Sequence, residues 1–268
     1  MTGAAMTITA RRSPPVVARP RAPGPRPAPD PRSLPWALLR SPLVFLDVET
    51  TGVGADDRII ELALIRVAPG EATRSLDTLV HPEGRPIHAR ATAIHGLRAP
   101  LLANAPCFGD LRPEVEELLA GAEVVAHNAP FDLRFLGAAL ARLGAGQPPA
   151  GLCTLRLARA LLPARSGPRS LDALCARFGV PAYGNAHTAW ADARRLPELL
   201  VALLSAAGSR ESAQAALSAA RCGVAAGVDA PLFAGLRENA LPVVLRSARD
   251  ETAAESVEIS TDTRPSQG

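Results

Sequence analysis

The chain has 268 residues, of which 47% are hydrophobic, and a formal net charge of +3. No apolar run is long enough to span a bilayer, because Arg, Pro or acidic residues interrupt the leucine-rich stretches. This excludes a membrane-embedded protein and predicts a soluble, cytoplasmic protein of one or two domains.

The basic charge is concentrated at one end of the chain. All 29 basic residues are Arg, and with the many Ala and Pro this composition is typical of a bacterial, high-GC genome. Residues 1–42 hold seven Arg and one acid, a net charge of +6, whereas residues 43–208 carry −1 and residues 209–268 carry −2. The core itself is therefore not basic, and the Arg content is weak support for nucleic-acid binding.

The first 42 residues contain ten Pro and little apolar periodicity, which predicts a disordered extension. An inert extension is favoured over a nucleic-acid-binding arm. The Pro density opposes the amphipathic helix of a mitochondrial transit peptide. The apolar run Trp36–Leu39 is a candidate for docking on the core.

The first motif follows an apolar run that predicts a buried strand over Leu43–Glu49. Side chains of a strand alternate between its two faces, so Asp47 and Glu49 project to the same side. The run Thr50–Gly52 then ends the strand. Taken alone, this pattern fits equally well a strand end with two solvated acids.

Further strands and helices follow in an order that predicts a mixed sheet. Three successive strands joined by short turns favour antiparallel pairing, and the later alternation of strands and helices favours parallel additions with helices covering the sheet. The strands are predicted over 43–49, 59–67, 75–81 and 123–127, and the helices over about 111–120, 131–143, 155–162, 170–178 and 188–206.

The second motif lies where the last predicted strand meets a helix. Pro130 suits the first turn of a helix, and Asp132 then lies in that turn, where the helix dipole favours an acid. His127 ends the strand and is more simply explained as a packed or hydrogen-bonded residue than as a metal ligand. Taken alone, Asp132 could be an ordinary helix-start acid.

The third motif lies at the start of the last predicted helix. Asp192 is near the beginning of the helix, and His187 precedes it by five residues, which is not a same-face helical spacing. His187 is therefore expected on the lead-in loop. Together the three motifs supply four acids and one His, which suits a two-metal nuclease, because Mg²⁺ prefers oxygen ligands and phosphodiester hydrolysis needs charge stabilisation.

In this order the motifs resemble those of the DnaQ-like 3′–5′ exonucleases, the DEDDh group that includes the epsilon subunit of bacterial DNA polymerase III. DVETTG resembles the first motif of that family, HNAPFD the second and H-x-x-x-x-D the third. The runs RSLDALCARFGV and IHGL are similar to epsilon-type sequences as well. One departure is Cys153, where epsilon-like sequences tend to have Asp, and this position has no assigned metal role.

The resemblance implies a ribonuclease H-like α/β fold and a site built from the motif residues. It implies that two Mg²⁺ or Mn²⁺ ions are held by Asp47, Glu49, Asp132 and Asp192, with His187 as the general base. It also implies that the terminal nucleotide is lined by Thr50, Thr51 and Gly52, and further by His95, Asn128 and Phe131.

The implied reaction is 3′–5′ hydrolysis of single-stranded DNA ends, in proofreading or repair, with a DNA polymerase subunit as a candidate partner. Two alternatives stay open at this point. One is an exoribonuclease, since contacts to the 2′-hydroxyl would decide the sugar preference. The other is an interaction subunit of a replication or repair complex whose nuclease activity is secondary.

The predicted domain organisation has three parts. Residues 1–42 form the extension, residues 43–208 the exonuclease domain, and residues 209–268 a C-terminal extension that is partly helical and then disordered. The four Cys show no C-x-x-C pair, so we expect free thiols and no zinc site.

Overall fold

A computed structural model describes residues 33–148, 150–183 and 187–223, which all belong to one compact unit. Its centre is a six-stranded sheet with the order β3-β2-β1-β4-β5-β6. The strands are β1 (Leu43–Thr50), β2 (Ile59–Val67), β3 (Arg74–Leu79), β4 (Glu123–Ala126), β5 (Gly151–Cys153) and β6 (Arg221–Cys222).

The sheet is mixed, as the sequence predicts. The strand β1 pairs antiparallel with β2 and parallel with β4. On one side β3 is antiparallel to β2; on the other, β5 is parallel to β4 and the edge strand β6 is antiparallel to β5. The register of β1 and β2 shifts between Glu49 and Thr50. Such an irregularity bends a strand and re-aims its side chains, here where the first motif leaves the sheet.

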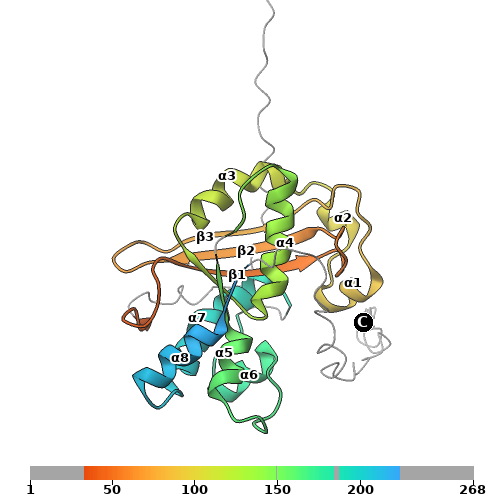
Figure 1. Ribbon diagram of the computed structural model, residues 1–268. Helices are drawn as coiled ribbons and strands as arrows, with labels where there is room; N and C mark the ends of the chain where they lie inside the picture. Colours follow the sequence, from red (N-terminus) through yellow and green to blue (C-terminus); the bar gives the residue numbers. More distant parts are fainter. Residues whose placement is uncertain (1–32, 149, 184–186, 224–268) are drawn as a thin grey trace, which may run out of the picture. The chain divides into compact units, whose positions relative to one another are not determined.

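Helices cover both faces of this sheet (Figure 1). Two short helices, α1 and α2, follow β3, and the longer α3 and α4 pack on one face while α5 to α8 lie on the other. The helices are α1 (Ala89–His95), α2 (Ala99–Leu102), α3 (Phe108–Leu119), α4 (Ala129–Arg142), α5 (Thr154–Leu161), α6 (Leu171–Phe178), α7 (Ala189–Ser205) and α8 (Arg210–Ala220).

Alternation along β1 divides the core into two layers. Leu43 and Phe45 face the layer with α5 to α8, and Val44, Leu46 and Val48 face the layer with α3 and α4. Each of these side chains is at most 5% exposed. Burying a side chain of this kind contributes about 1.5–3 kcal/mol, so β1 is anchored from both sides before its acidic end begins.

The predicted fold class, a ribonuclease H-like mixed sheet flanked by helices, is confirmed, with differences at the element level. The helices α3 and α4 begin two to three residues earlier than predicted, and α1, α2, β5 and β6 were not predicted. These four elements are seven residues long or shorter. A short strand such as β5 exists because β4 offers it parallel hydrogen bonds, which local sequence does not encode.

The buried core reaches beyond the predicted 43–208 domain on both sides. Leu34 and Leu39 are 4% and 9% exposed, and Leu217 of α8 is 1% exposed, all within the layer that α7 covers. Trp36 packs against the same layer, as expected of the Trp36–Leu39 run. The domain limits stay a prediction, and the disordered extensions lie mainly outside the described residues. Within the described part, no helix is long and apolar enough to cross a membrane.

Candidate active site

The first motif places two acids on one face of β1. Asp47 and Glu49 continue the alternation of Leu43 and Phe45, so they face the layer in which α7 packs across β1 and β2. In the antiparallel register Glu49 lies opposite Glu61 of β2. Directly opposite residues on neighbouring strands share a face, so Glu61 adds a third carboxylate to this surface.

The second motif brings Asp132 to the same end of the sheet from the other layer. Because β4 runs parallel to β1, the turn after β4 opens near the acidic end of β1. Asp132 lies in the first turn of α4, and its Oδ1 accepts a hydrogen bond from the backbone N–H of Val48 at 3.3 Å. This bond links α4 to the residue between Asp47 and Glu49.

Asp47 lies within the combined field of the other acids. Burial raises the pKa of Asp47 well above its ordinary value, and the negative charges of Asp132, Asp192, Glu49 and Glu61 raise it further. Burial also raises the pKa of Asp132 well above its ordinary value, against the hydrogen bonds from its own N–H and from Val48. The four predicted acids therefore converge, and the negative charges of the other three raise the pKa of Asp47.

The third motif supplies Asp192 in the first turn of α7, where an arginine holds it. Arg195 Nη1 donates to Asp192 Oδ1 at 3.1 Å and to Asp172 Oδ1 of α6 at 2.7 Å. Burial raises the pKa of Asp192, and Arg195 opposes this rise. The sequence did not single out Arg195 or Asp172, because their contact depends on how α6 packs against α7.

His187 lies on the lead-in loop to α7, as predicted. It is exposed and has a φ of 60°, an uncommon conformation for a residue other than glycine. Thr188 follows as the N-cap of α7, and its side chain accepts a hydrogen bond from the N–H of Ala191. Burial raises the pKa of Asp192, and a positive charge on His187 would oppose this rise, so the imidazole lies within electrostatic range of Asp192.

The residues present fit the divalent ions that the resemblance implies. The four predicted ligands offer only carboxylate oxygens, which hard cations prefer, and a divalent ion would neutralise the repulsion that raises the pKa of Asp47. Among the described residues, no three His, Cys, Asp or Glu side chains are already arranged to hold a metal ion. Asp192 and Asp132 are turned instead towards Arg195 and Val48.

The predicted nucleotide-lining loop is held by hydrogen bonds of its own. Thr50 and Thr51 are 5% and 0% exposed; the Thr50 hydroxyl donates to the carbonyl of Gly52 and the Thr51 hydroxyl to Asp57. His95, at the end of α1, is buried and lies beside this loop, with Nε2 donating to the Thr50 carbonyl at 3.2 Å. The bond from the Leu97 N–H to Nδ1 of His95 fixes that tautomer.

Asn128 and Phe131 lie where the second motif enters α4. Asn128 is the N-cap of α4 in the left-handed conformation, with a φ of 64°. Phe131 is half-buried and packs against the core, with its ring centroid 4.9 Å from that of Phe135. The guanidinium of Arg134 lies over both rings. Core packing therefore accounts for part of the Phe131 ring, and its contact with a base stays a prediction.

His127 is a structural residue at the end of β4, as its sequence position favoured. Its Nε2 donates to the carbonyl of Arg169 at 3.0 Å, and its Nδ1 lies 2.9 Å from the Thr154 hydroxyl. Burial lowers the pKa of His127 to about 4, against the hydrogen bond to Arg169. The imidazole is therefore neutral at physiological pH and ties β4 to α5 and to the segment that leads into α6.

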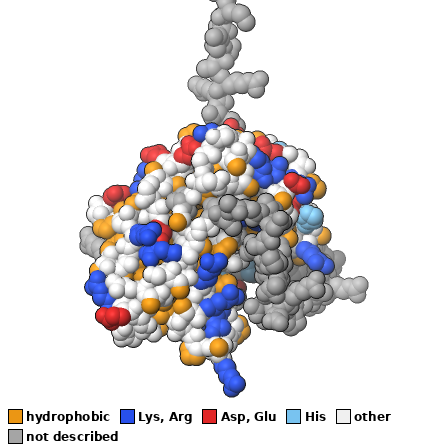
Figure 2. Space-filling view, in the orientation of Figure 1, with side chains coloured by type: hydrophobic (Ala, Val, Ile, Leu, Met, Phe, Trp, Pro, Cys, Tyr) orange, Lys and Arg blue, Asp and Glu red, His pale blue; other side chains and the backbone are white. Residues whose placement is uncertain are grey.

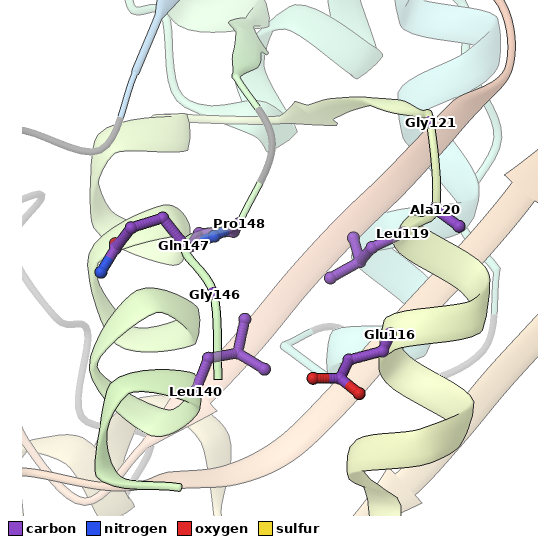
Figure 3. A pocket seen from close by; sticks show the side chains of 8 residues that line it. All are labelled: Glu116, Leu119, Ala120, Gly121, Leu140, Gly146, Gln147 and Pro148. Carbon is purple, nitrogen blue, oxygen red and sulfur yellow. The ribbon is translucent and has the colours of Figure 1, made fainter. Parts of the chain in front are cut away.

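A cavity lies apart from this cluster. A cavity of about 300 Å³ opens where α3 ends and β4 is about to begin, lined among others by Glu116, Leu119 and Leu140 (Figure 3). This is the opposite end of β4 from the second motif, and none of the predicted site residues lines it. On the face in Figure 2, Arg side chains are interspersed with Asp and Glu.

Comparisons with known proteins give the chain its family. The family model described as an exonuclease matches residues 44–200. A DNA polymerase III subunit epsilon-like protein of Rhodobacter capsulatus is 38% identical over 184 residues, which cover 65% of this chain and 26% of that protein. The DNA polymerase III subunit epsilon of Rickettsia felis is 33% identical over 179 residues, which cover 63% of this chain and 76% of the relative.

Solved structures agree with this result. Exonuclease X in complex with 5′ overhanging duplex DNA has a TM-score of 0.51 and 28% identity, covering 65% of this chain and 99% of that one. Escherichia coli exonuclease I in complex with a dT13 oligonucleotide, at 18% identity and a TM-score of 0.52, shares the fold over 60% of this chain and 40% of that one. The first two curated relatives are matched over only 26% and 28% of their own length. The chain belongs to the DnaQ-like family of 3′–5′ exonucleases, which are phosphodiester hydrolases.

Proposed function

We propose that this chain is a metal-dependent enzyme that releases nucleotides from single-stranded 3′ ends of DNA. The observation that carries the proposal is the convergence of four acids from three separate motifs: Asp132 accepts from the N–H of Val48, which lies between Asp47 and Glu49, and the charges of Asp132, Asp192 and Glu49 raise the pKa of Asp47. Buried like charges are destabilising unless a cation binds among them, so a cluster of this kind is typical of a functional site.

The proposed ligands are Asp47, Glu49, Asp132 and Asp192, and the proposed ions are two Mg²⁺ or Mn²⁺. Such ions, when bound, supply charge stabilisation to the phosphate on which negative charge develops. The residues of the chain fix where this happens. Asp132 is oriented by the Val48 N–H, and Asp192 by Arg195, so two of the four carboxylates have defined positions before any ion binds.

His187 is the proposed general base, whose imidazole nitrogen takes a proton from the attacking water. It is exposed and precedes the first residue of α7 by two positions, so its imidazole is accessible to water. A positioned base of this kind contributes about 10²–10⁴-fold to a rate. In this proposal the loop at Thr50–Gly52 and the helix start at Asn128 and Phe131 orient the terminal nucleotide.

A DNA polymerase is the proposed partner of this activity. The support is the similarity to proteins named as epsilon subunits of DNA polymerase III, of which the Rickettsia felis protein is matched over 76% of its length. Affinity capture of the full chain from cell extract, with and without its C-terminal 45 residues, tests this part of the proposal. Failure to recover a polymerase would leave the nuclease proposal standing and remove the partner.

The decisive experiment on the reaction is a time course with single-stranded DNA and RNA of equal sequence. Substrates labelled at the 3′ end should lose the label as mononucleotide at once, and substrates labelled at the 5′ end should shorten as a ladder. Mg²⁺ or Mn²⁺ should support the reaction and EDTA should stop it. Faster RNA cleavage would favour the exoribonuclease alternative, because sugar preference depends on contacts to the 2′-hydroxyl.

A further inference from the structure

The loop that follows the first motif is organised around a buried acid that no motif includes. Asp57 is 1% exposed and lies in the turn between β1 and β2. Its Oδ1 accepts from the Thr51 hydroxyl at 2.9 Å and from Arg85 Nε at 3.0 Å, and its Oδ2 accepts from the Gly54 N–H at 2.7 Å. One carboxylate therefore joins both ends of the loop to a segment 28 residues further along the chain.

Further hydrogen bonds close to Asp57 fix the backbone of the same loop. Thr51 exchanges hydrogen bonds with Arg58, since its N–H donates to the Arg58 carbonyl at 2.8 Å and its hydroxyl accepts from the Arg58 N–H at 3.0 Å. The Thr51 carbonyl accepts from the N–H of His88 at 2.8 Å. Burial alone would raise the pKa of Asp57, but the hydrogen bonds from Gly54, Arg85 and Thr51 outweigh it and lower that pKa.

Gly52 shows how closely this loop is packed. A Cβ at Gly52 would meet the ring of His88 and the carboxylate of Asp57. The next residue, Val53, is 51% exposed although it is apolar, and its carbonyl accepts from Arg134 of α4. The loop thus has a buried, hydrogen-bonded base and an exposed apolar tip, immediately after the strand that carries Asp47 and Glu49.

We propose that Asp57 is a positioning residue that holds the loop at Thr50–Val53 in the shape that receives the terminal nucleotide, and that it does so through Arg85. This inference rests on the proposed function and adds to it a residue outside the three motifs. The hydrogen bonds of the Asp57 carboxylate go to Thr51, Gly54 and Arg85 rather than to the metal-ligand acids or the base, so we expect its loss to affect substrate affinity.

A structural role alone would have a different signature. Loss of a residue that only stabilises the fold reduces the fraction of active molecules, which lowers the apparent kcat and leaves KM unchanged. Loss of a residue that shapes the nucleotide-binding loop raises KM. Charge-assisted hydrogen bonds of the kind that Asp57 makes correspond to about a tenfold or larger change in an equilibrium constant.

The test compares two neighbouring acids with the same chemical change. Asp57→Asn should raise KM for single-stranded DNA, and weaken binding of a nucleoside 5′-monophosphate, by about tenfold, with kcat per active molecule within about twofold of the wild type. Asp56→Asn is the matched control, because Asp56 is exposed and its side chain makes none of the loop contacts. It should behave as the wild type. Mn²⁺ affinity, measured by electron paramagnetic resonance, should be the same in all three proteins.

Arg85→Gln provides the second arm, which also serves if Asp57→Asn fails to fold. It should also raise KM, and the double variant Asp57→Asn/Arg85→Gln should be no worse than Asp57→Asn alone, since the contact that Arg85 makes is with Asp57 itself. An unchanged KM in the single variants, or fully additive effects, would overturn the inference. If the wild type shows no turnover on 3′ ends, the proposed function is rejected instead. In that case the nucleoside 5′-monophosphate should bind weakly, and equally weakly to the wild type and to Asp57→Asn.

Discussion

Arg195 donates to Asp192, three residues before it on α7, at 3.1 Å, and the same Nη1 donates to Asp172 of α6 at 2.7 Å. The Arg195 side chain is 9% exposed and that of Asp192 15%, so this pair is poorly solvated. A buried guanidinium thus supplies positive charge beside one proposed ligand, whereas the charges that most affect the pKa of Asp47 are those of four acids.

The first prediction follows from this asymmetry. Arg195→Gln should lower the free energy of unfolding of the metal-free protein by about 1.5–3 kcal/mol, the contribution of a hydrogen bond to a charged group. Excess Mn²⁺ should recover part of the loss, because an ion can neutralise Asp192 in place of Arg195. Urea unfolding with EDTA and with Mn²⁺ measures both values. Equal losses in the two conditions would show that Arg195 acts only by joining α6 to α7.

The second prediction concerns Asp47 and pH. Burial and neighbouring acids raise the folded-state pKa of Asp47 above its unfolded value, so the ionised group destabilises the metal-free fold at neutral pH. Asp47→Asn should therefore have a higher Tm than the wild type at pH 7.5 in EDTA. This advantage should shrink as pH falls through the raised pKa towards the ordinary Asp range. A lower Tm for Asp47→Asn than for the wild type at pH 7.5 would contradict this prediction. The control is Asp56→Asn, which makes the same change at an exposed acid.

The third prediction concerns His127. Its folded-state pKa of about 4 lies below its ordinary value of 6.5, so on acidification the unfolded chain takes up a proton first. Stability should fall between about pH 6.5 and pH 4 and level off below that, by on the order of 3 kcal/mol for this residue. The difference between wild type and His127→Gln across this range isolates the effect, with the half-buried His81→Gln as control. A parallel pH profile for wild type and His127→Gln would reject it.

The sequence predicted the elements that carry the motifs because their patterns are local. Period-two alternation placed Asp47 and Glu49 on one face, and a proline in the first turn marked the start of the helix with Asp132. The contacts of Asp57, Glu61 and Arg195 were not predicted. Each of them depends on packing between distant segments, as in the 28 residues that separate Asp57 from Arg85.

The solvent exposure of the motif residues is a second property that could not be predicted from the sequence. The DVETTG run was expected to line the nucleotide through Thr50, Thr51 and Gly52, and all three are buried, with the two hydroxyls engaged inside the loop. Val53, which the motif does not include, is the first of four consecutive exposed residues that follow it. The predicted lining thus stays a proposal, in which these residues act through the shape of the loop.

The fourth prediction concerns His187. As a base outside the set of metal ligands, His187→Ala should lower turnover by about 10²–10⁴-fold. Its Mn²⁺ affinity should match that of the wild type, since carboxylates and water satisfy a hard ion. Single-turnover cleavage combined with a Mn²⁺ binding titration separates the two quantities. A parallel loss of metal affinity and activity would identify His187 as a ligand.

The central claim is that the acids converging on Asp47 carry out hydrolysis from the 3′ end. The most direct measurement follows a 5′-labelled single-stranded DNA in Mg²⁺ with wild type and Asp47→Asn side by side, after circular dichroism has shown that both are folded. The wild type should give a ladder that shortens one nucleotide at a time, and the substrate should stay intact with Asp47→Asn. Cleavage by Asp47→Asn at a rate near that of the wild type, or removal of the 5′ label as the first product of the wild type, would contradict this claim.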